Sequence, residues 1–126
     1  SIMSDFNQCY NLSDAIKRCS HLDQMNFYWF EEPIRFDDYD GCSKLSKMFK
    51  TPFIIGENFH GPVDAKTALV SNASSMIMPD LMRIGGVSGW LKTAAIAETF
   101  NIPVSTHLFP ESFTMLKGVA KYIFYL

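Results

Sequence analysis

Short stretches of consecutive apolar residues recur along the chain, separated by longer stretches in which apolar positions follow a helical period. Consecutive apolar residues are typical of strands that are buried on both faces, and such strands belong to parallel sheets. Pro103 cannot donate a hydrogen bond to a neighbouring strand, so we expect it near the beginning of its own strand. The pattern predicts strands at residues 27–30, 53–55, 76–78 and 102–104.

The stretches between these strands carry apolar side chains at the spacing of one helix face. Asn11 is suited to cap the first of these helices, and Asp14 is suited to its first turn. Pro62 is suited to the first position of the third helix. Helices are predicted around residues 12–22, 45–49, 62–69 and 87–97.

The alternation of strands and helices predicts an α/β fold with parallel strands joined by right-handed crossovers. The chain has 126 residues, the size of one modest domain, and 48% of them are hydrophobic. That is enough apolar material to form a core, so the composition argues against disorder. We expect residues 1–126 to belong to one domain.

A polar residue able to take part in chemistry follows each of these four strand candidates, and another follows the apolar pair Ile2–Met3, which is a fifth strand candidate. The step is 26 residues from position 5 to 31 and from 31 to 57, then 23 to position 80 and 27 to position 107. This period matches one strand–helix unit of a β/α barrel, in which the carboxyl ends of the strands converge on the active site. The five residues are Asp5, Glu31, Glu57, Asp80 and His107.

The first three of these residues are carboxylates on neighbouring strands. Converging carboxylates raise one another's pKa unless a cation offsets their charge. A site of oxygen ligands suits a hard divalent cation, and Mg²⁺ is the first choice. Asp5, Glu31 and Glu57 are therefore predicted magnesium ligands, the alternative being acids exposed at the strand ends without a metal.

Charge and cysteine content narrow the functional classes. The net charge is −2 and no basic cluster is present, which argues against a nucleic-acid partner. The apolar runs are too short to span a membrane. Cys9, Cys19 and Cys42 are odd in number and lack C-x-x-C spacing, which argues against a disulfide framework or a zinc site. We expect a reduced, cytoplasmic setting.

The two ends of the sequence are unusual for a complete domain. The chain begins with Ser1, and residues 122–126 have the pattern of a buried strand that is just beginning. We therefore expect the chain to be a piece of a longer protein.

Several motifs occur in a fixed order along almost the whole chain. They are DFNQ at 5–8, WFEEP at 29–33, GEN at 56–58, MPDLMRIGGV at 78–87 and STHLF at 105–109. Together they resemble the enolase superfamily, and more closely its mandelate racemase group within the mandelate racemase and muconate lactonizing enzyme family. The resemblance implies a partial (β/α)8 TIM barrel that runs from the end of the third strand to the beginning of the eighth.

The resemblance implies a Mg²⁺-dependent enzyme that abstracts the proton α to a carboxylate. The product of the resulting enediolate would be a racemised or dehydrated 2-hydroxy acid or sugar acid. Asp5, Glu31 and Glu57 would bind the metal, and His107 would be a general base oriented by Asp80. A small-molecule carboxylate would be the partner, and a homo-oligomer is expected.

Three further polar residues have less defined roles. Asn7 lies two residues after Asp5, on the same face if the strand continues, and is a candidate for contact with substrate. Glu32 should point away from Glu31, so it either supports the ligands or forms a structural ion pair. Arg83 either balances charge at the site or caps a loop.

The family pattern also contains parts that this sequence lacks. These are a Lys-x-Lys pair on the second strand, a Glu at the end of the eighth strand and an N-terminal capping domain. Two interpretations therefore stay open. The chain is part of a racemase or dehydratase, or it is a catalytically incomplete metal-binding fragment that needs the rest of its chain or a partner.

Overall fold

The computed structural model describes residues 2–108, and the strand expected at 122–126 lies outside them. Four parallel strands form one sheet in the order β1-β2-β3-β4, and a helix follows each strand. The predicted α/β alternation is confirmed. The elements are β1 (Ser4–Asp5), α1 (Leu12–Leu22), a short 3₁₀ helix η1 (Asp23–Met25), β2 (Phe30–Glu31), α2 (Tyr39–Met48), β3 (Phe53–Ile55), α3 (Pro62–Val70), β4 (Met76–Ile77) and α4 (Gly86–Thr99).

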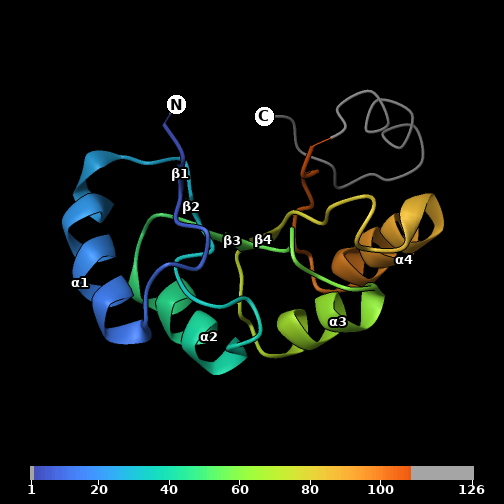
Figure 1. Cartoon of the computed structure of the whole chain (residues 1–126), viewed down its shortest axis with the longest axis horizontal. Helices are drawn as coiled ribbons and strands as arrows, with labels where there is room; N and C mark the ends of the chain where they lie inside the picture. The colour runs from blue at the N-terminus through green and yellow to red at the C-terminus, as the bar shows by residue number, and fades with distance from the viewer. Residues whose placement is uncertain (1, 109–126) are drawn as a thin grey trace.

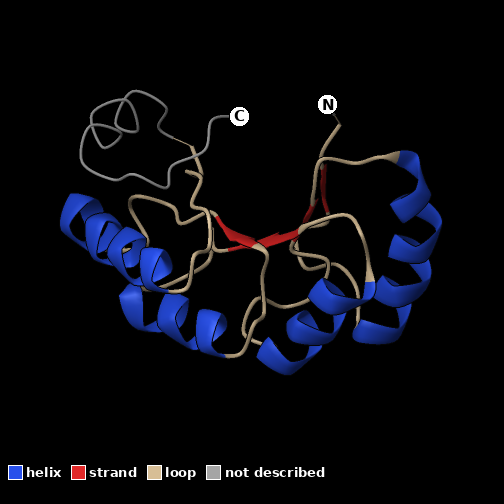
Figure 2. Ribbon diagram, turned by 180° about the vertical axis from the view of Figure 1, so that it is seen from behind, coloured by secondary structure: helices blue, strands red, loops and turns tan. Residues whose placement is uncertain are grey.

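The four helices lie along one side of the sheet and follow one another in chain order, as Figure 1 shows. The view from behind in Figure 2 shows the same single layer of helices against the strands. The chain returns to the sheet after α4, where Val104 pairs with Ile77 and His107 pairs with Asp80, both in parallel. The strand predicted at 102–104 is thus present as two separate pairings rather than as a continuous ladder.

The second strand is shorter than the sequence predicts. Its regular pairing covers Phe30 and Glu31 only, because the backbone bends at Tyr28 where the chain enters the sheet. Pairing with the first strand still begins early, since the Tyr28 N–H donates to the carbonyl of Ile2 and the Ser4 N–H to that of Trp29. The hydrophobic run marked Trp29 and Phe30 correctly as buried, but Tyr28 is exposed and the strand begins later than predicted.

Both faces of the sheet are buried at β2 and β3, as expected for parallel strands, whereas Asp5 in β1 is exposed. Successive strand side chains point to opposite faces, so the strand residues divide into two clusters. One cluster joins Phe30, Phe53, Ile55 and Ile77 to helix residues that include Ala15, Leu45, Ala65 and Trp90. The other cluster consists of the buried residues Trp29, Ile54 and Met78.

Side-chain caps fix where the helices begin and how they connect to the strands. The Asn11 side chain accepts the Asp14 N–H at 3.0 Å, as predicted, and Pro62 occupies the first turn of α3. At the other end of α1, the Asp23 carboxylate accepts the N–H of Thr51 at 2.8 Å and that of Lys50 at 3.3 Å. Asp23 therefore ties the end of α1 to the segment that leads into β3.

Two glycines allow backbone segments to approach closely. Gly56 follows β3 with a φ of +141°, and a Cβ there would lie 2.8 Å from the Met78 nitrogen. Gly89 lies in α4, and a Cβ there would lie 1.9 Å from the Ile84 carbonyl oxygen.

Among residues 2–108, no helix has both the length and the apolar character needed to cross a membrane.

Candidate active site

Three carboxylates meet at the carboxyl ends of the first three strands. Asp5 ends β1 and pairs in register with Glu31 at the end of β2, while Glu57 follows β3 by two residues. One carboxylate oxygen from each residue lies within 4.8 Å of the other two. The convergence expected from the strand–helix period is therefore present in the fold.

The electrostatics of this cluster favour a cation. Burial and, after it, the nearby charges of Asp5 and Glu57 raise the pKa of Glu31 to about 7, against the lowering effect of a hydrogen bond from Trp29. That bond runs from the indole Nε1 to Glu31 Oε2 at 3.3 Å. Three carboxylates that repel one another fit a hard divalent cation, which would offset the repulsion and bind one oxygen of each as a ligand.

His107 and Asp80 form a hydrogen-bonded pair beside the cluster. His107 Nδ1 lies 2.8 Å from Asp80 Oδ2, while Asp80 Oδ1 accepts the backbone N–H of Met82 at 2.8 Å and of Arg83 at 3.1 Å. Burial would raise the pKa of Asp80, but the bonds from His107 and the two N–H groups outweigh it, so this pKa lies below its ordinary value. An ionised Asp80 orients the imidazole with Nδ1 as donor.

The second ring nitrogen of His107 faces the acidic cluster. His107 Nε2 lies 3.1 Å from Glu57 Oε2, and the two side chains are 21% and 12% exposed. The imidazole thus reaches Asp80 with one nitrogen and Glu57 with the other. The five residues that the sequence singled out form one continuous site.

The family-model comparison covers almost the whole chain. The model for enolase C-terminal domain-like proteins matches residues 1–121. The chain belongs to the enolase superfamily. Its fold is accordingly a partial TIM barrel of the mandelate racemase type.

Individual relatives carry out different reactions. The chain is 30% identical over 106 residues to L-talarate/galactarate dehydratase of Salmonella typhimurium, covering 84% of this chain and 27% of the relative. An enolase from the alpha proteobacterium bal199, solved with bound magnesium, is 41% identical with a TM-score of 0.89, covering 99% of this chain and 35% of that one. A racemase from Streptomyces coelicolor, also with bound magnesium, is 26% identical with a TM-score of 0.93, covering 98% and 34%. The chain thus spans about a quarter to a third of these enolase-superfamily proteins.

The three less defined residues all lie in or beside the site. The prediction that Asn7 continues the strand face is wrong, because β1 ends at Asp5 and Asn7 has a φ of +44°. In this turn, its N–H and Nδ2 donate to the two oxygens of Asp5 at 2.9 and 2.6 Å. Asn7 therefore holds the Asp5 carboxylate directly.

Glu32 and Arg83 occupy the space around Glu57. Glu32 is only 1% exposed and accepts three hydrogen bonds, and within residues 2–108 it forms no ion pair. Arg83 donates through one guanidinium nitrogen to the Glu57 carbonyl at 3.1 Å, and the same nitrogen lies 3.8 Å from Glu57 Oε1. Its position fits the charge-balancing alternative.

Sequence reasoning missed three residues that contact the site. Trp29 was placed in the predicted strand 27–30 and in the WFEEP motif but given no role, although a side chain two positions before Glu31 on a strand shares its face. Gln8 donates to Glu32 at 2.8 Å, and Asn58 donates to both Glu32 and Glu57. No spacing in the sequence distinguishes these last two.

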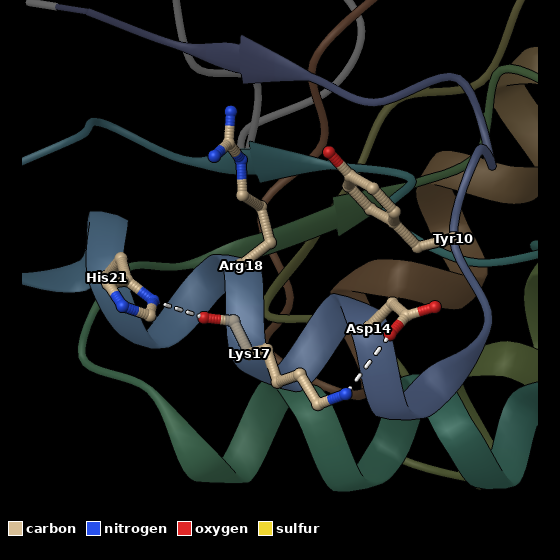
Figure 3. A pocket seen from close by; sticks show the side chains of 5 residues that line it. All are labelled: Tyr10, Asp14, Lys17, Arg18 and His21. Carbon is tan, nitrogen blue, oxygen red and sulfur yellow. Dashed lines mark hydrogen bonds and ion pairs between the residues drawn. The ribbon is translucent and has the colours of Figure 1, made fainter.

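A shallow hollow elsewhere on the surface lacks such chemistry. Figure 3 shows its lining, which consists of Tyr10, Asp14, Lys17, Arg18 and His21 on and beside α1. Lys17 pairs with Asp14 at 3.4 Å, and His21 Nδ1 bonds the Lys17 carbonyl at 2.7 Å, both within the helix. None of these residues belongs to the strand-end cluster, which remains the candidate active site.

Proposed function

We propose that this chain forms the part of a barrel that binds Mg²⁺ and supplies one general base in an enzyme acting on a carboxylate substrate. The enzyme would abstract the proton α to the carboxylate and racemise or dehydrate a 2-hydroxy acid or sugar acid. The observation that carries this proposal is the position of the His107 imidazole. Its Nδ1 is held by Asp80, and its Nε2 lies beside Glu57 in the acidic cluster.

The acidic cluster would hold the metal through Asp5, Glu31 and Glu57, whose oxygens are already close together. When bound, Mg²⁺ stabilises the negative charge that develops on a substrate carboxylate as the α-proton leaves. Asn7 keeps the Asp5 oxygens in place, and Trp29 does the same for Glu31.

His107 would accept the α-proton at Nε2. Its Nδ1–H donates to Asp80, which selects the tautomer whose Nε2 carries a lone pair. Once Nε2 has taken the proton, the Asp80 carboxylate stabilises the imidazolium. The low pKa of Asp80 keeps it ionised for this purpose at neutral pH.

Racemisation and dehydration share the same first step. If the α-carbon is reprotonated on the opposite face, the acid is racemised; if a β-hydroxyl leaves as water, an enol forms and becomes a 2-oxo acid. The relatives include both a dehydratase and a racemase. The residues of this chain serve proton abstraction in either case, and the homo-oligomer and the cytoplasmic location stay predictions.

The proposal is tested by proton exchange in D₂O. The full-length protein that carries this chain is incubated with Mg²⁺ and a panel of 2-hydroxy acids and sugar acids, and α-deuterium and 2-oxo products are followed by NMR. We expect exchange or water loss with at least one acid, and none after chelation of the metal. Metal binding without exchange of any acid would favour the metal-binding fragment instead.

The 126-residue chain expressed alone separates the two interpretations further. The four parallel strands within residues 2–108 are too few to close into a barrel, and open sheet edges pair with other chains. We expect the isolated chain to be oligomeric or aggregated in gel filtration and inactive toward the same acids. A stable monomer that turns over any of them would show that this chain needs no further part.

A further inference from the structure

The side chain of Asn58 joins three charged residues around the acidic cluster. Its Nδ2 donates to Glu32 Oε2 at 2.7 Å and to Glu57 Oε1 at 3.2 Å. Its Oδ1 accepts a hydrogen bond from the Arg83 guanidinium at 2.8 Å. One amide therefore connects residues that follow β2, β3 and β4, and both its amide nitrogen and its carbonyl oxygen are engaged.

Glu32 provides a fixed anchor for this amide. It is 1% exposed, and its Oε2 also accepts from Gln8 Nε2 at 2.8 Å, while its Oε1 accepts from the Gly56 N–H at 3.3 Å. A buried carboxylate with three donors, from the segments that follow β1 and β3, has no solvent to turn toward. The position of Asn58 is thus set by the ends of the strands themselves.

The amide holds one oxygen of the Glu57 carboxylate, and the imidazole of the base lies beside the other. Asn58 donates to Glu57 Oε1, and His107 Nε2 lies 3.1 Å from Glu57 Oε2. The bond from Asn58 restricts rotation of the carboxylate plane and so fixes where Oε2 lies relative to His107. A change at Asn58 would therefore be transmitted both to a metal ligand and to the base.

Only an amide fits all these contacts. Its NH₂ group faces two carboxylates and its carbonyl faces a guanidinium, so donors and acceptors are each matched. An aspartate of the same shape would keep the bond from Arg83 but would place an acceptor oxygen against Glu32 and Glu57. We propose that Asn58, anchored by Glu32, is a positioning residue that orients the Glu57 carboxylate for the metal and for His107.

This inference rests on the proposed metal site, and its first test uses metal affinity rather than turnover. The full-length protein is stripped of metal and titrated with Mn²⁺, with the free ion followed by electron paramagnetic resonance. Partners that orient metal ligands typically contribute roughly 10- to 100-fold in affinity. We expect N58D to bind Mn²⁺ roughly 10- to 100-fold more weakly than the wild type.

The sign of this change discriminates between two explanations. A negative charge added near a cation should by itself strengthen binding. Weaker binding by N58D would therefore reflect the lost orientation of Glu57. N101D is the matched control, because it makes the same substitution at an exposed position outside the site. It should bind Mn²⁺ as tightly as the wild type does. Wild-type or tighter binding by N58D would overturn the proposal.

A second variant exchanges donor and acceptor between the two partners. In E32Q/N58D, the amide introduced at position 32 can donate to the new carboxylate at position 58, and the total charge equals that of the wild type. We expect this double variant to recover part of the affinity lost in N58D, which a general loss of structure would not allow. Circular dichroism verifies folding, and N58A, which removes the bonds without adding charge, replaces N58D if the latter does not fold.

A second readout tests the connection to the base. At saturating Mg²⁺, where the metal site is filled, N58A should still show a lower rate constant for α-proton exchange, because Glu57 no longer presents a fixed oxygen to His107. An unchanged rate constant would contradict that part of the inference. If the wild type binds Mn²⁺ but exchanges no acid, the proposed function fails, and the Mn²⁺ titrations alone decide the role of Asn58.

Discussion

His107 Nε2 lies 3.1 Å from Glu57 Oε2, so the candidate base and a candidate metal ligand are direct neighbours. The other ring nitrogen of His107 is held by Asp80 at 2.8 Å. The imidazole is therefore positioned by Asp80, with its Nε2 beside Glu57 at a different strand end. Any substrate carbon that His107 reaches must lie close to the metal ligands, as α-proton abstraction next to a metal-bound carboxylate requires.

Replacement of His107 by Asn should slow proton exchange from one face of the α-carbon. Loss of one general base typically costs about 10²- to 10⁴-fold in rate. Deuterium incorporation measured separately for each enantiomer of an accepted acid checks this expectation. His60→Asn is the control, because His60 is exposed and lies outside the cluster. If the His107 variant exchanges each enantiomer as fast as the wild type does, His107 is not part of the mechanism.

Glu31→Gln should strengthen the metal-free fold while weakening the metal site. Burial and the neighbouring charges raise the pKa of Glu31 from 4.5 to about 7, so the folded state loses stability as the pH rises between these two values, and the full penalty is present above about 7. The amide removes that charge, and its oxygen can still accept from Trp29. We expect a higher midpoint of thermal unfolding for the metal-free variant at about pH 8, the pH that this raised pKa makes most informative. The same variant should lose the stabilisation that Mg²⁺ gives to the wild type.

The converse result would be equally informative about this site. If Glu31→Gln lowers the unfolding midpoint of the metal-free protein, the acidic cluster is not under electrostatic strain. If Mg²⁺ stabilises the variant as much as the wild type, Glu31 is not a ligand. Lys17→Gln, a change of one exposed charge on α1, serves as the control and should leave the response to Mg²⁺ unaltered.

Much of this architecture was predictable because strand burial and strand–helix period are local properties of the sequence. The apolar runs located β3 and β4, and the regular step located Asp5, Glu31 and Glu57 at neighbouring strand ends. Strand boundaries were less predictable, because they depend on partners far along the chain. The early end of β1 is the clearest example, and it invalidated the expected strand face of Asn7.

The supporting contacts of the site were the least predictable part. Asn58 meets Glu32 and Arg83 across separations of 26 and 25 residues, which only the register of the sheet brings together. No periodicity distinguishes such an asparagine from one in an ordinary loop. Trp29 was obscured differently, because its buried ring matched the core pattern while its N–H served Glu31.

Asp23→Ala should destabilise the fold without affecting the site directly. The Asp23 carboxylate accepts two backbone N–H groups ahead of β3, and its loss should cost roughly 1–2 kcal/mol in the free energy of unfolding. Burial acts to raise its pKa, but the bonds from Thr51 and Lys50 together outweigh this and lower it. Its contribution is therefore present above the ordinary value of 3.8 and is lost as the pH falls through the lowered pKa.

Urea unfolding at several pH values tests this dependence. The difference between wild type and Asp23→Ala should be largest near neutral pH and should shrink below about pH 4, where the wild-type carboxylate gains a proton. Glu98→Ala, at an exposed position in α4, should change the free energy of unfolding by less than about 0.5 kcal/mol. A pH-independent difference for Asp23→Ala would contradict the bonding argument.

Gly89→Ala should destabilise the first turn of α4. The added Cβ would lie 1.9 Å from the Ile84 carbonyl oxygen, which is backbone and cannot rotate away. Overpacking of this kind costs roughly 1–3 kcal/mol. Thermal unfolding should show a clear drop for this variant and almost none for Ser88→Ala, an exposed neighbour in the same helix. An unchanged midpoint for Gly89→Ala would mean that the helix can shift at little cost.

The glycine after β3 has a consequence for how the gene can vary. Gly56 has a φ of +141°, and a Cβ added to it would collide with backbone atoms of Met78. It immediately precedes Glu57 in the sequence. Every missense change of a glycine codon adds a side chain, so every such allele would push apart the backbones that place this carboxylate. Natural selection should therefore remove all amino-acid replacements at this codon wherever the activity is under selection, while synonymous changes accumulate freely.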